Sequence, residues 1–95
     1  MNAAAFSATL GQAAPPQDIS GPLVGLWWAA KGNWDKAHKV VQDDESRDAA
    51  WVHAYLHRVE GDLPNARYWY GQAARPPRSD ALEDEWAAMV AALLD

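Results

Sequence analysis

The amino-acid sequence predicts an all-α protein made of two helical hairpins with one further helix on each side. The main observation is a phrase that occurs twice, at residues 32–37 (GNWDKA) and 61–66 (GDLPNA), an offset of 29 residues. Each copy supplies a glycine to end one helix, a polar residue to cap the next, and a small residue for close packing. In addition, apolar residues recur at helical spacing, and no segment shows the alternation of a half-buried strand.

The first 21 residues predict an arm rather than part of the repeat. Residues 2–12 are rich in alanine, and Phe6 and Leu10 are spaced i, i+4, which favours a short amphipathic helix. Pro15 and Pro16 then end any helix, because proline lacks the amide N–H and restricts the residue before it. We therefore expect an N-terminal arm over 1–21, with a proline-rich linker, and a single helical-repeat domain over 22–95.

The first hairpin is predicted over residues 22–42. Ser20 is positioned to cap a helix that ends at Gly32, and Asn33 to cap a second helix up to Gln42. A connection this short makes the two helices antiparallel neighbours. The residues predicted to face inward are Leu23, Leu26, Trp27 and Ala30 in the first helix, and Trp34, Ala37 and Val41 in the second.

The second hairpin is predicted over residues 47–75 by the same reasoning. Its first helix ends at Gly61, Asp62 caps its second helix, and Pro64 lies in the first turn, where proline is tolerated. Residues 43–46, three acids followed by Ser46, are interpreted as a solvated connector. The expected inward faces are Val52, Tyr55, Leu56 and Val59, followed by Leu63, Ala66, Tyr70 and Ala73.

A capping helix is predicted over residues 79–94, after the break at residues 75–78. Ser79 or Asp80 is the expected cap, and Asp80 with Glu83 has the spacing of a capping box. The acidic residues 83–85 would stabilise the helix, because negative side chains interact favourably with the positive N-terminal end of the helix dipole. The expected buried face is Leu82, Trp86, Met89 and Leu93.

Composition narrows the possible functions. The chain has 95 residues, a net charge of −5 and no cysteine. This length indicates one domain. The negative charge makes nucleic acid a poor partner, and the absence of cysteine excludes disulfides, thiolate metal sites and cysteine nucleophiles. Without a long apolar segment or a recognisable secretory signal in residues 1–11, we expect a cytoplasmic protein with no membrane partner.

The glycine–cap–x–x–x–alanine phrase resembles the tetratricopeptide repeat, a helix–turn–helix unit of about 34 residues. The resemblance covers about residues 22–76. The 29-residue offset is shorter than the family's repeat, and His53 and His57 stand where the family prefers leucine and an aromatic residue. It implies a protein-binding scaffold whose flanking helices act as caps. The sequence also looks like a group of small bacterial proteins without assigned function. That second resemblance is carried by residues 26–32 and 51–58. The positions that match the tetratricopeptide repeat are Gly25, Trp28, Gly32, Ala37, Ala54, Gly61, Ala66 and Tyr70.

Six tryptophans in so small a chain predict an interface, because a small core holds few large rings and tryptophan is favoured at contact surfaces. We expect a protein–protein interaction or self-association module, with a protein partner or a second copy as in a homodimer. The serines lie at predicted caps or in the arm, so we expect no catalysis. The predicted partner-binding residues are Trp27, Trp28, Trp51, His53, Tyr55 and His57.

The alternative is a small-molecule or divalent-metal-binding helical domain. His53 and His57 are spaced i, i+4, and Glu60 follows three residues later, so one helix face could present all three to a metal ion. However, the H-E-x-x-H signature is missing, and His38 is the only other histidine. The first reading therefore expects no metal and no cofactor.

Overall fold

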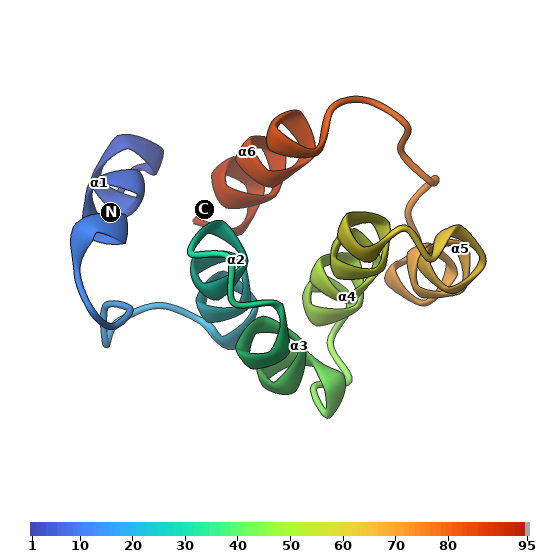
Figure 1. The fold of residues 1–95 in the computed structure, drawn as a ribbon, viewed down its shortest axis with the longest axis horizontal. Helices are drawn as coiled ribbons and strands as arrows, with labels where there is room; N and C mark the ends of the chain where they lie inside the picture. The colour runs from blue at the N-terminus through green and yellow to red at the C-terminus, as the bar shows by residue number, and fades with distance from the viewer. Residues whose placement is uncertain (95) are drawn as a thin grey trace.

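The computed structural model describes residues 1–94, and this part of the chain contains six α-helices, one short 3-10 helix and no strand (Figure 1). The prediction of an all-α fold is therefore confirmed. The helices begin and end within a few residues of the expected positions. Their bounds are α1 Ala3–Ala8, η1 Thr9–Gly11, α2 Gly21–Ala30, α3 Trp34–Gln42, α4 Arg47–Glu60, α5 Leu63–Ala73 and α6 Leu82–Leu93.

The repeated phrase forms two similar turns. Gly32 and Gly61 follow α2 and α4 with φ angles of 78° and 84°, the left-handed conformation that glycine adopts without a steric penalty. The side chains of Asn33 and Asp62 then accept a hydrogen bond from the backbone N–H three residues further on. As a result α2 packs on α3, and α4 packs on α5.

Replacing Gly32 by alanine tests the turn directly. An added Cβ at Gly32 would meet no atom within 4 Å, so the cost comes only from the left-handed backbone. We expect Gly32→Ala to lower the free energy of unfolding by about 1–2 kcal/mol. Gly71→Ala is the matched control, because Gly71 lies inside α5 with equally open surroundings; it should raise stability by about 0.5–1 kcal/mol. Urea denaturation of both variants measures the contrast, and a neutral Gly32→Ala would contradict it.

Helix α4 is the centre of the fold. It packs on α5, α3, α2 and α6 (Figure 1), and all residues from Ala49 to His57 are buried. The predicted inward faces are wrong at three positions: Val59 and Leu63 are 43% and 52% exposed, and Ala30 is exposed as well. All three lie next to the glycine turns, where the helices end and neighbouring helices no longer cover them.

Helix α6 lies against α2, α4 and α1 (Figure 1). It starts at Leu82, and its N-cap residue is Ala81, whose side chain offers no capping hydrogen bond. The predicted cap at Ser79 or Asp80 is therefore wrong. The carboxylate of Asp80 instead accepts hydrogen bonds from Arg78, which draws it away from the helix terminus.

The N-terminal arm packs onto the rest of the protein. Phe6 is completely buried, and its ring centroid lies 6.0 Å from that of Trp86 in α6. The indole N–H of Trp27 donates to the hydroxyl of Thr9, and Lys31 donates to the carbonyl of Leu10. These contacts explain how so short a helix is held in place, since an isolated helix of this length would be unstable.

Candidate functional site

Five of the six predicted partner-binding residues are buried within the chain itself. Trp28 is the exception; its ring is partly exposed and lies 4.3 Å from the ammonium group of Lys36. A partner could therefore reach Trp28 directly, but would reach the others only if a neighbouring helix moved. The buried residues are Trp27 (0% exposed), Trp51 (3%), His53 (4%), His57 (5%) and Tyr55 (7%).

The structure separates the predicted residues of α4 into two groups on opposite sides of the helix, as residue spacings of two and four require at 3.6 residues per turn. Trp51 and Tyr55 face α6, where Trp51 contacts Glu85 and Tyr55 adjoins Leu82. The two histidines lie on the side of α3 and α5. The site therefore consists of two separate arrangements, one under α6 and one around the histidines.

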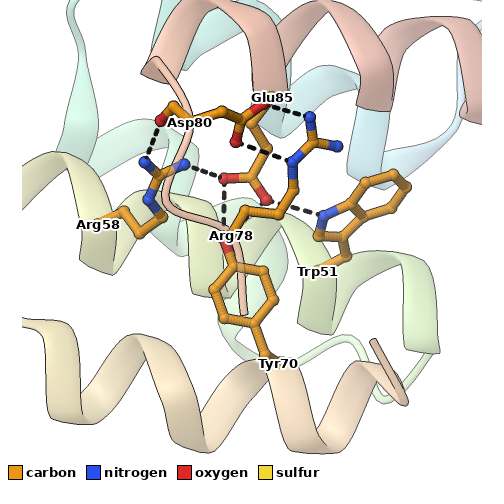
Figure 2. A network of polar contacts seen from close by, with 6 residues as sticks. All are labelled: Trp51, Arg58, Tyr70, Arg78, Asp80 and Glu85. Atoms are coloured by element: carbon orange, nitrogen blue, oxygen red, sulfur yellow. Dashed lines mark hydrogen bonds and ion pairs between the residues drawn. The ribbon is translucent and has the colours of Figure 1, made fainter. Parts of the chain in front are cut away.

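The first arrangement centres on Glu85 of α6, whose side chain is fully buried (Figure 2). The indole N–H of Trp51 donates to Oε2 at 3.0 Å, and the hydroxyl of Tyr70 lies 2.8 and 2.7 Å from the two carboxylate oxygens. Arg58 donates to Oε1 at 2.7 Å, and its guanidinium also donates to the backbone carbonyl of Asp80. Side chains of α4 and α5 therefore hold a carboxylate that α6 supplies.

The electrostatics of this arrangement fit a charged Glu85. Three donor side chains, of which Arg58 is positively charged, compensate the carboxylate for the loss of water. Burial, and then the hydrogen bond to Glu85, raise the pKa of Tyr70, so its hydroxyl keeps the proton that it donates. The segment before α6 adds a further contact, because the guanidinium of Arg75 lies 3.5 Å from the centroid of the Trp51 ring.

A second contact anchors α6 to α2. The indole N–H of Trp86 donates to the backbone carbonyl of Leu26 at 2.9 Å, across 60 residues of sequence. Met89 and Val90, in the next turn of α6, are buried. A shallow hollow of about 270 Å³ remains beside this contact and is lined by Ala30, Tyr55, Leu82, Glu83 and Trp86.

The second arrangement brings together all three histidines of the chain. His38 comes from α3, and His53 and His57 come from α4. One ring nitrogen from each lies within 4.8 Å of the other two, and the Nε2 atoms of His38 and His53 are 3.0 Å apart. Glu60 is exposed, but its carboxylate lies 2.6 Å from Nδ1 of His57. His38 therefore lies beside the three residues predicted as the alternative metal site, His53, His57 and Glu60.

Aromatic side chains hold two of these rings in place. Trp34 stacks on His38 with centroids 4.7 Å apart, and Trp69 stacks on His53 at 3.9 Å. Burial, followed by the nearby His38 and His57, lowers the pKa of His53 to about 4. Burial and His57 also lower the pKa of His38. At neutral pH both rings are therefore uncharged and have a nitrogen lone pair available.

Two residues of the candidate site, Glu85 and His38, are not identified by sequence-based reasoning. The local sequence predicts Glu85 only as one of several acids in the first turn of a helix. The available signal was its place on the apolar stripe, three residues after Leu82 and four before Met89, which points it at the core. The sequence shows His38 only as a further histidine, because no pattern within one helix shows which residue of another helix will face it.

Comparison with known proteins identifies no relative. No family model matches the chain, and neither a curated protein nor a solved structure is significantly similar to it. Within residues 1–94, none of the helices combines the length and the apolar character that a membrane crossing requires. We therefore infer the function from the two arrangements described above.

Proposed function

We propose that this chain is a protein-interaction module that receives an amphipathic helix on the face formed by α2 and α4, called here the receiving face. In the described structure its own α6 lies on that face. The observation that carries the proposal is the buried Glu85, which gives this docking a specific polar anchor in addition to apolar contact. Catalysis is not part of the proposal, and the cytoplasm is its expected setting.

The repeated architecture supports this proposal. The two turns share a left-handed glycine and a side-chain cap, and Gly25 allows α2 to approach its neighbours closely. A Cβ at Gly25 would lie 3.0 Å from Val41 of α3 and 3.3 Å from Val52 of α4. Such turns and close contacts are expected of tetratricopeptide-like units, whose stacked helices present extended surfaces to partners.

We propose the α6 helix of a second copy as the partner, so that the module self-associates by exchange of α6. Residues 74–81 connect α5 to α6 without regular secondary structure. This segment could carry α6 to the receiving face of another copy. Exchange would re-form the contacts of Glu85 and Trp86 between copies, at the cost only of association entropy.

A labelled peptide of residues 80–94 tests the receiving face. We expect it to bind the full chain carrying Trp86→Ala, in which the chain's own α6 has lost its bond to Leu26, at least tenfold more tightly than it binds the unmodified chain. The same peptide with glutamine in place of Glu85 should not bind, because Arg58 and Tyr70 would lose their charged partner. Fluorescence anisotropy measures the affinities.

The outcomes separate clearly, provided circular dichroism shows that the variant stays helical. Equal binding of the normal and glutamine peptides would contradict specific docking through Glu85. Failure of both to bind the folded variant would show that the receiving face accepts only its own α6. Light scattering of the unmodified chain over a range of concentrations then reports whether copies exchange α6 in solution; a monomer at every concentration would contradict self-association.

A further inference from the structure

We infer that His38, His53 and His57 form a binding site for one divalent transition-metal ion, with Zn²⁺ as the best-fitting ion. The site lies between α3, α4 and α5, on the side of α4 away from α6, and is independent of the proposed interaction function. The three residues are the only histidines of the chain, and two helices bring them to one point.

The spacing of the nitrogens fits a shared ion. Zinc–imidazole bonds of about 2.0–2.1 Å place the nitrogens of a tetrahedral site roughly 3.3 Å apart. His38 and His53 already have their Nε2 atoms 3.0 Å apart, and the third ring lies within 4.8 Å of them. Small side-chain rotations would bring the three nitrogens to coordination distance, and His53 and His57 are on successive turns of one helix, a common spacing for zinc ligands.

The surroundings of the rings also resemble those of metal ligands. The Nδ1 atom of His57 bonds to Glu60, which orients the ring and leaves Nε2 for an ion, as in carboxylate–histidine–zinc arrangements. Trp34 and Trp69 stack on the other two rings and fix their planes. The Nδ1 atom of His53 is buried and has no hydrogen-bond partner among the described residues, so this polar cluster is not satisfied by protein contacts alone.

The donor set selects the class of ion. Three neutral imidazoles suit zinc, copper, nickel and cobalt, whereas magnesium and calcium prefer oxygen ligands. Three histidines leave a fourth position of a tetrahedral site for water or another ligand.

Titration of the untagged full chain with Zn²⁺ by calorimetry, and with Co²⁺ by visible absorption, tests this site. We expect one ion per chain with an affinity in the micromolar range or tighter, and the intense visible bands of four-coordinate Co²⁺. Quenching of tryptophan fluorescence by Co²⁺ should accompany binding, because Trp34 and Trp69 lie against the ligands.

Three variants distinguish the ligands. His38 is only partly buried, so His38→Gln should stay folded and weaken Zn²⁺ binding more than Glu60→Gln, for which loss of the orienting carboxylate should cost about 10- to 100-fold. Asp62→Asn is the matched control, because Asp62 lies near His57 and Glu60 in a competing three-residue group and asparagine keeps the helix cap. Its affinity should equal that of the unmodified chain.

Three results would overturn the inference. They are the absence of saturable Zn²⁺ binding by the unmodified chain, undiminished binding by His38→Gln, and loss of binding in Asp62→Asn. The last result would move the ion to His57, Glu60 and Asp62, which also lie within 4.8 Å of one another. The variants leave α6 untouched, so the peptide experiment on the receiving face can fail or succeed separately.

Discussion

Glu85→Gln is expected to lower the free energy of unfolding by about 3 kcal/mol, because it removes the charge that Arg58 and two neutral donors surround. Glutamine keeps nearly the same volume, so the effect comes from the lost charge pairing and from a poorer match to the donors. Chemical denaturation monitored by circular dichroism measures it. In a domain of this size the melting temperature should fall by roughly 10 °C or more.

Glu83→Gln is the control for this experiment. It makes the same chemical change two residues earlier in α6, at an exposed position. Its effect should stay within about 0.5 kcal/mol, as is usual for surface substitutions. Similar stability losses in the two variants would show that the helix dipole, rather than the buried contacts, determines the role of these acids.

Trp27→Ala is expected to cost about 3–5 kcal/mol, whereas the neighbouring Trp28→Ala should cost less than half as much. Trp27 is completely buried and its indole N–H donates to the hydroxyl of Thr9 in the arm. Its loss therefore creates a cavity and removes the donor to this partly buried hydroxyl. Trp28 is partly exposed, and its main polar contact is the surface cation of Lys36, which contributes about 0.5–1 kcal/mol.

The comparison of the two tryptophans also tests which ring is available to a partner. Thermal and urea unfolding give the free energy of unfolding of each variant. Because Trp28→Ala leaves the core unmodified, its free energy of unfolding should stay close to that of the parent protein. If the two substitutions cost the same, the placement of α2 in the structure is wrong. If Trp28→Ala were the more damaging, the inward face of α2 would have to be rotated by about one residue.

Local features of the sequence explain most of the fold. The two glycine turns, their caps and the helix bounds follow from interactions within a few residues, and these predictions are confirmed at Gly32, Asn33, Gly61 and Asp62. The errors occur where tertiary packing decides. Val59 and Leu63 continue an apolar stripe in the sequence, yet both are exposed in the structure. Periodicity shows the direction of a side chain but does not show whether a neighbour exists there.

The candidate site was less accessible to prediction. The spacing of His53 and His57 within one helix was visible in the sequence, but the approach of His38 depends on the crossing of α3 and α4. The contact of Glu85 with Trp51 joins residues 34 apart, and Trp86 reaches Leu26 across 60. Such pairs depend on the position of α6, and an acidic run at a helix start gives a local explanation that hides a buried carboxylate.

Hydrogen exchange of the tryptophan indole N–H groups, followed by NMR, tests the docking of α6 most directly. We expect slow exchange for Trp51, bonded to Glu85, and for Trp86, bonded to the carbonyl of Leu26, with fast exchange for the partly exposed Trp28. Glu85→Gln should accelerate exchange at Trp51 and Trp86 together. Exchange of both as rapid as that of Trp28 in the unmodified protein would contradict the docking of α6 on the receiving face.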